Sequence, residues 1–169
     1  MTNCTLNGNA ASVNGGALYN AISSPMTLAN CIVWGNGTSA LYGSPTATYS
    51  CIEGALWPGI GNINADPRFA AAGDAHLLST SPCIDAGNNG AVPAGVSTDL
   101  DGRPRFVDVP GIPDSGNGTP PIVDMGAYEC AGTVRPDFDQ DGDVDLVDFS
   151  FFQACFNGPN RDPARTGCD

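Results

Sequence analysis

Six aspartates gather in the stretch DFDQDGDVDLVD, residues 137–148, although charged residues make up only 14% of the chain. Carboxylates this close repel one another unless a cation lies between them. They occupy positions 1, 3, 5, 7, 9 and 12 of a twelve-residue loop, and Gly142 at position 6 supplies the sharp turn that a calcium loop requires. The sequence therefore predicts a bound Ca²⁺. Its predicted ligands are Asp137, Asp139, Asp141, Asp143 (through its backbone carbonyl), Asp145 and Asp148.

A helix is predicted directly after this loop. In LVDFSFFQACF, Phe149, Phe152 and Phe156 recur at the spacing of one helical face, and Gly158 and Pro159 end the helix. The loop closes with aspartate at its twelfth position, where the usual EF-hand loop has glutamate. With these features the segment resembles one half of a type I dockerin. The resemblance implies a calcium-folded module that docks to a cohesin-like protein, although dockerins carry two such loops and this segment has one.

The composition favours cations over polyanions as partners. Six Lys and Arg residues stand against eighteen acids, which gives a net charge of −12. This balance disfavours nucleic acid and anionic membranes as partners, and no apolar run approaches the roughly 20 residues of a membrane span. The 22 glycines and 14 prolines indicate turns rather than long helices. The first residues contain no export signal, so we expect the chain to be the C-terminal part of a longer exported protein.

A repeat is visible at the start of the chain. Residues 3–9 read NCTLNGN, residues 30–36 read NCIVWGN at an offset of 27, and a weaker copy, SCIEG at 50–54, follows after 20 more residues. Repeats of this length, built from short apolar runs between Gly and Asn, indicate a solenoid whose coils stack on one another. An antiparallel sandwich with coincidental sequence similarity is the alternative.

Seven cysteines occur without any CxxC pair, so zinc and iron–sulfur sites are not expected. Stacked coils would align Cys4, Cys31 and, in the weaker copy, Cys51. Because parallel Cβ vectors suit a disulfide poorly, we expect a ladder of buried free thiols. Asn3 and Asn30 would stack beside that ladder at the turn.

Four further motifs follow the repeat in a fixed order. They read ADPRF at 65–69, HLLSTSPCIDAGNN at 76–89, DLDGRPRF at 99–106 and VDMGAYEC at 123–130. With the repeat, this series resembles the right-handed parallel β-helix of bacterial surface and secreted proteins, and in particular the choice-of-anchor Q domain. The resemblance covers residues 1–130. It implies a fold and an exported location, but not a reaction.

An enzyme is the rival hypothesis, because parallel β-helices also carry polysaccharide lyases and glycoside hydrolases. The carboxylates and arginines of DLDGRPR form either an acid–base cluster in a groove or a turn with paired charges, and we favour the turn. His76 is expected at a strand edge rather than as a base. A glycosidase needs two facing carboxylates, and no spacing singles out a pair. The available carboxylates are Glu53, Asp66, Asp85, Asp124 and Glu129.

Four aromatic residues, Trp34, Tyr42, Tyr49 and Trp57, form either a sugar-stacking strip on the outer wall or packing at coil corners. We favour packing.

Together these patterns predict a mainly β chain. Residues 1–70 form coils of a right-handed parallel β-helix, 71–130 an irregular β-rich part, 131–136 a linker, and 137–169 a dockerin-like half-module with an EF-hand-like loop and helix. The predicted function is non-catalytic attachment, adhesion or carbohydrate contact by a secreted or cell-surface bacterial protein with a structural calcium site. The alternative is a calcium-assisted polysaccharide lyase or glycoside hydrolase. Polysaccharide, a cohesin-like protein and self-association through exposed coils are the expected contacts.

Overall fold

The computed structural model describes residues 1–21, 24–37, 39–54, 56–130, 146–147 and 149–150. The chain divides into two compact units, Met1–Gly132 and Thr133–Asp169. In the first unit, the strands are β1 (Thr5–Asn7), β2 (Leu18–Tyr19), β3 (Thr27–Ala29), β4 (Ile32–Trp34), β5 (Leu41–Tyr42), β6 (Thr46–Thr48), β7 (Cys51–Ile52), β8 (Phe69–Ala71) and β9 (Asp74–Leu77), and one short 3-10 helix is η1 (Asn89–Ala91). The mainly β class predicted from the sequence is confirmed.

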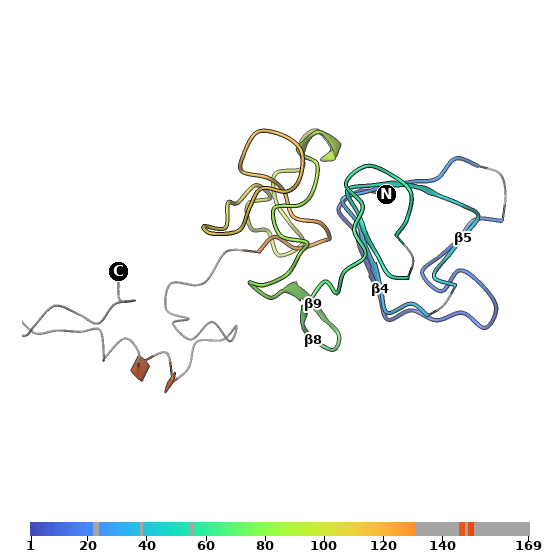
Figure 1. Cartoon of the computed structure of the whole chain (residues 1–169), viewed down its shortest axis with the longest axis horizontal. Helices are drawn as coiled ribbons and strands as arrows, with labels where there is room; N and C mark the ends of the chain where they lie inside the picture. The colour runs from blue at the N-terminus through green and yellow to red at the C-terminus, as the bar shows by residue number, and fades with distance from the viewer. Residues whose placement is uncertain (22–23, 38, 55, 131–145, 148, 151–169) are drawn as a thin grey trace, which may run out of the picture. The chain divides into compact units, whose positions relative to one another are not determined.

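Successive passes of the first unit pair in parallel in three separate ladders. Strands β1, β4 and β7 form a three-stranded sheet, while β2 pairs with β5 and β3 pairs with β6 (Figure 1). The predicted offset of 27 between the first two copies is confirmed, because Asn9 and Asn36 lie side by side 27 residues apart, joined by a hydrogen bond. Between these two copies, Leu18–Tyr19 forms β2.

The three-stranded sheet is packed on both of its faces. Leu6, Val33 and Ile52 are register partners, and they pack in the cluster that also contains Leu28 and Ala47. The neighbouring positions face the other way, because side chains alternate along a strand. There Ile32 and Cys51 pack against Cys83 and Met125 from the later motifs.

The third copy of the repeat is one residue out of the register that the sequence suggested. Ile32, not Cys31, is the partner of Cys51, and the Cys31 amide instead donates to the Ser50 hydroxyl at 3.1 Å, an offset of 19. A one-residue slip moves a side chain to the opposite face of a sheet. The predicted cysteine ladder therefore contains Cys4 and Cys31, whereas Cys51 lies on the other face beside Cys83.

Cys4, Cys31 and Cys51, which the sequence predicted as free thiols, are free, and so is Cys83. Asn3 and Asn30 adopt the same left-handed backbone, with φ of 50° and 52°, at the turn before the first and second strands of the sheet. Asparagine tolerates this conformation better than most side chains. The Asn30 amide then bridges to Asn88, donating to its carbonyl at 2.9 Å and accepting from its N–H at 2.7 Å.

The remainder of the first unit consists mostly of loops. Strands β8 and β9 form an antiparallel hairpin, and residues 78–130, all of which the structure describes, contain η1 and isolated bridges but no longer strand (Figure 1). These loops lie against the three-stranded sheet at Gly126, whose φ is +100°. A Cβ there would meet Thr5 Oγ1 at 2.8 Å and Ile32 Cδ1 at 2.9 Å, so the approach requires glycine.

In the second unit, the backbone is helical at 146–147 and 149–150, within the segment where a helix was predicted. Phe149 is exposed there. The predicted calcium ligands and the linker at 131–136 lie outside the described residues.

Candidate functional site

The motif SPCIDAG places Asp85 at the centre of the later loops. Asp85 is completely buried and has a left-handed backbone with φ of 50°. Its N–H donates to Asp124 Oδ1 at 2.8 Å, and its carbonyl accepts the N–H groups of Ser115 at 2.9 Å and Gly116 at 3.0 Å. Asp85 is thus fixed from both sides of its own backbone.

Three carboxylates meet at this point. Asp85, Asp108 and Asp114 each offer an oxygen, and these oxygens lie within 4.8 Å of one another. Asp108 and Asp114 are exposed, while Asp85 forms the buried floor of the group. Carboxylate oxygens are the ligands that hard divalent cations prefer, so this cluster could hold a metal ion.

The buried Asp85 carboxylate has few groups around it that stabilise its negative charge. One oxygen, Oδ2, accepts the Val109 N–H at 3.4 Å, and the other, Oδ1, has no hydrogen-bond partner. Burial raises the pKa of Asp85 to about 6, the Val109 hydrogen bond opposes this rise, and the charges of Asp114 and Asp108 add to it.

A second group of acids, from two of the later motifs, forms a buried network around Arg105. Arg105 Nη1 lies 3.1 Å from Glu129 Oε2, with the two residues 3% and 2% exposed. Glu129 Oε1 accepts the Asp124 N–H at 2.9 Å, and Asp124 Oδ2 accepts the Cys130 N–H at 2.7 Å. Burial raises the pKa of both Asp124 and Glu129. Arg105, Asp124 and Glu129 thus bond to backbone groups or to one another inside the fold, and the buried Arg105 Nε has no hydrogen-bond partner.

The DLDGRPR stretch forms the turn that the sequence favoured. Asp99 Oδ1 accepts the N–H groups of Asp101 and Arg103, both at 2.9 Å, and Asp99 Oδ2 accepts the Glu129 N–H at 2.9 Å. Arg105 then turns inward, while Arg103 stays at the surface with a long 3.8 Å contact to Asp101. Asp99 and Arg105 both line a cavity of about 440 Å³, where the Asp99 oxygens accept backbone N–H groups and Arg105 bonds to Glu129 and to the carbonyls of Gly126 and Ala127.

His76 lies in β9 of the two-stranded hairpin, as the strand-edge prediction expected. Its Nδ1 is 2.5 Å from Asp74 Oδ1, its Nε2 is 2.9 Å from Asp101 Oδ2, and its ring stacks on Tyr128 with centroids 4.0 Å apart. Hydrogen bonds to Asp101 and then Asp74 raise the pKa of His76. With both ring nitrogens occupied, the imidazole is placed to join the hairpin to the turn rather than to accept a substrate proton.

The four aromatic residues proposed for a sugar strip do not form one. Trp34 and Tyr49 pack against one core cluster and Trp57 against the other, which is the predicted packing role. Only Tyr42 is exposed, and its ring stacks on that of Tyr19, a residue that the sequence reasoning did not single out. The two tyrosines are register partners in β2 and β5.

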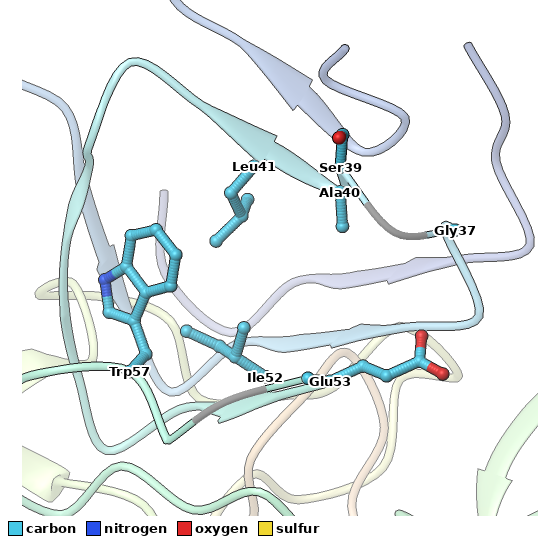
Figure 2. A pocket seen from close by; sticks show the side chains of 8 residues that line it. Gly37, Ser39, Ala40, Leu41, Ile52, Glu53 and Trp57 are labelled. Atoms are coloured by element: carbon cyan, nitrogen blue, oxygen red, sulfur yellow. The ribbon is translucent and has the colours of Figure 1, made fainter. Parts of the chain in front are cut away.

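A cavity of about 410 Å³ opens beside β5 and β7 (Figure 2). Leu41, Ile52 and Trp57 give it an apolar lining, and Glu53 is the one carboxylate among the described residues that line it. Glu53 Oε2 is already engaged by the Gly35 N–H at 2.7 Å. A single engaged carboxylate does not provide the facing pair that glycoside hydrolysis requires.

The described carboxylates from the sequence-based search thus have different environments. Asp85, Asp124 and Glu129 come together in the interior, while Glu53 accepts the Gly35 N–H and Asp66 accepts the Arg68 N–H elsewhere. Asp108 and Asp114 were missed, because no spacing rule connects them to Asp85. Their only signal is that both flank a loop rich in proline and glycine.

Among the residues that the structure describes, no helix has the length and apolar character needed to cross a membrane. Comparisons of this chain with protein-family models, with curated proteins and with solved structures find no match.

Proposed function

We propose that this chain is a non-catalytic attachment part of a secreted or cell-surface bacterial protein, built on a right-handed parallel β-helix. The observation that carries the non-catalytic assignment is the engagement of the motif residues. Asp99, Arg105, Asp124 and Glu129 bond to backbone groups or to one another, and they are buried. A general acid or base must instead reach a substrate proton.

The β-helix assignment is supported by the three parallel ladders. Each ladder joins one pass of the chain to the next, and the partners Leu6, Val33 and Ile52 stack at equivalent positions in an apolar cluster. This is the arrangement expected of coils that bury a shared interior. The contact of the third and fourth later motifs at Arg105 fits the resemblance to the choice-of-anchor Q domain.

The contact surface we propose is the Tyr19–Tyr42 pair. The two rings lie 4.8 Å apart and within 6° of parallel, and the residues are 58% and 42% exposed. Aromatic faces at the surface, with polar groups nearby, suit the apolar face of a sugar ring. The proposed partner is therefore a polysaccharide.

The calcium-binding part of the proposal rests on the aspartate spacing at 137–148. A cation there would fold the dockerin-like half-module, which would in turn present its helix to a cohesin-like protein. The test is calcium titration of the full chain and of the variant Asp139→Asn/Asp141→Asn. The double variant should lose one binding equivalent, and an unchanged stoichiometry would remove the loop assignment.

The attachment function is tested by co-sedimentation with insoluble acidic and neutral polysaccharides, with the soluble fraction assayed for new reducing ends and unsaturated uronates. We expect retention without product, and about tenfold weaker retention for Tyr19→Ala/Tyr42→Ala, since one aromatic stacking contact is worth about 0.5–1.5 kcal/mol. Phe106→Ala, which removes another exposed ring, is the control and should bind normally. Product formation would overturn the non-catalytic assignment and favour the lyase or hydrolase.

A further inference from the structure

We propose that Asp85, Asp108 and Asp114 bind a calcium ion, at a site separate from the aspartate loop at 137–148. Asp85 is completely buried, yet its Oδ1 accepts no hydrogen bond. An unpaired carboxylate oxygen in a protein interior is costly, so its persistence in the fold points to a ligand that satisfies it.

That ligand must be positive. Asp85 shares its position with the carboxylates of Asp108 and Asp114, whose oxygens lie within 4.8 Å of its own. None of the ion pairs found among the described residues includes any of the three. A neutral donor could pair with Asp85 Oδ1 but would leave the mutual repulsion of three charges in place.

The donor set selects calcium among the common divalent cations. All three ligands are carboxylates, the hard oxygen donors that Ca²⁺ and Mg²⁺ take, and the cluster has no histidine or cysteine that would favour zinc. The oxygens lie within 4.8 Å of one another, which one ion can bridge, since opposite ligands of Ca²⁺ lie about 4.6–5.2 Å apart. Three carboxylates also suit Ca²⁺ better than Mg²⁺, which keeps several waters and usually takes one or two carboxylates.

The coordination sphere can be completed without further protein groups. Asp85 Oδ2 is engaged by Val109 N–H, which leaves Asp85 Oδ1 and the carboxylates of Asp108 and Asp114 for the ion. Both of these aspartates are exposed, so water can fill the remaining positions of a six- to eight-coordinate site.

Binding would fasten a loop at both of its ends. Asp108 and Asp114 lie on either side of residues 109–113. Next to them in the chain, the Val109 N–H already donates to the Asp85 side chain, and the N–H groups of Ser115 and Gly116 donate to the Asp85 carbonyl. An ion that joins the three carboxylates should therefore slow the opening of these hydrogen bonds.

The experiment uses the full chain carrying Asp139→Asn/Asp141→Asn, so that the loop at 137–148 does not contribute. Calorimetric titration with CaCl₂ alone should show one saturable site. Adding Asp114→Asn or Asp108→Asn should weaken calcium binding by about tenfold or more, because charge count sets the affinity of such sites. Asp66→Asn removes one exposed carboxylate elsewhere and keeps a side-chain oxygen for the Arg68 N–H, so it should leave binding within about twofold.

Amide hydrogen exchange supplies a second measurement, and its main result comes from the parent protein without any change in the cluster. In the parent protein, calcium should slow exchange at Val109, Ser115 and Gly116, and in Asp114→Asn it should not. No saturable binding up to about 10 mM calcium, beyond the weak end of extracellular sites, would overturn the proposal. Equal affinity in the parent and in both aspartate variants would overturn it as well. Neither outcome bears on the polysaccharide test, which uses a different surface.

Discussion

Replacing Arg105 with methionine should be the most damaging single substitution among the charged residues of the motif network. The guanidinium is 3% exposed and makes three hydrogen bonds. Its Nη1 donates to Glu129 Oε2 at 3.1 Å and to the Gly126 carbonyl at 3.3 Å, and its Nη2 donates to the Ala127 carbonyl at 3.1 Å. Methionine fills much of the volume but satisfies none of these acceptors.

The expected loss of stability comes from the buried groups that the substitution leaves without a partner. Glu129 would be left buried without its cation and would take up a proton, because burial already raises its pKa and Arg105 no longer opposes that rise. Removing one partner of a buried ion pair typically costs about 3–5 kcal/mol. The two orphaned carbonyls are part of the same loss and should not be added to it. We therefore expect the free energy of unfolding to fall by about 4 kcal/mol. For a urea slope of about 2 kcal/mol/M, the midpoint moves by roughly 2 M.

The assay is urea unfolding at pH 7, followed by tryptophan fluorescence, with two companion variants. Arg103→Met is the matched control, because Arg103 is exposed and has only a 3.8 Å ion pair, so it should cost at most about 0.5 kcal/mol. Arg105→Met/Glu129→Gln should recover about 1–3 kcal/mol relative to Arg105→Met, because the amide is neutral and its oxygen can still accept the Asp124 N–H. This reasoning would be refuted if Arg105→Met lowered the free energy of unfolding by less than about 1 kcal/mol, or if the double variant were less stable than Arg105→Met.

Three further perturbations test other parts of the first unit. The pKa of His76 is raised in the folded state, so its stabilisation is fully present below the unfolded value of about 6.5 and is lost as pH rises through the folded value; urea midpoints should show His76→Gln less stable than the parent by about 0.5–1 kcal/mol at pH 5.5 and by less at pH 9. Asn30→Ala should cost about 2–4 kcal/mol in the same assay, since it leaves the Asn88 N–H unpaired, removes one of the two donors to the Asn88 carbonyl and puts alanine in a left-handed backbone. Burial raises the pKa of Cys31 to about 11, so mass spectrometry after iodoacetamide labelling of the native protein at pH 8 should find Cys31 modified far more slowly than the half-buried Cys4.

Each of these has an outcome that contradicts its premise. A His76→Gln effect that grows with pH would mean that the neutral imidazole stabilises the fold. Equal stability of Asn30→Ala and Asn30→Gly would mean that the left-handed backbone at residue 30 does not strain alanine. A loss of less than about 1 kcal/mol in both variants would mean that water replaces the hydrogen bonds to Asn88. Equal labelling of Cys31 and Cys4 would place Cys31 in contact with solvent.

The sequence predicted the strand register correctly where two well-matched copies of the repeat could be aligned. The Asn-Cys pairs at 3–4 and 30–31, followed in each case by Gly-Asn, predicted which positions pair at an offset of 27, and that pairing is confirmed. The weaker copy misled because a shared cysteine was used to align it. In the structure, the glycines Gly35 and Gly54 and the apolar partners Val33 and Ile52 share the register, and cysteine does not. Apolar burial decides register because it involves every residue of a strand, whereas one thiol involves only itself.

The acidic cluster was beyond sequence reasoning for a different reason. The twelve-residue loop at 137–148 can be recognised because all of its ligands are local, and local spacing is visible in a sequence. Asp85, Asp108 and Asp114 come together only because Asp85 bonds to the backbone at 115–116 and Asp124 bonds to Asp85. That closure depends on tertiary contacts, which no single-sequence pattern encodes.

The dense acidity of the later motifs is explained by the scarcity of regular structure around them. In a ladder each backbone N–H finds a carbonyl, but residues 78–130 have only η1 and isolated bridges, so many N–H groups need other acceptors. Asp99 accepts three of them and Asp124 two. A buried carboxylate does this well because it has two oxygens and no donor of its own. Acids that are used in this way hold loops together, and they need a compensating charge only where several converge, as around Arg105 and, by our proposal, around a cation at Asp85.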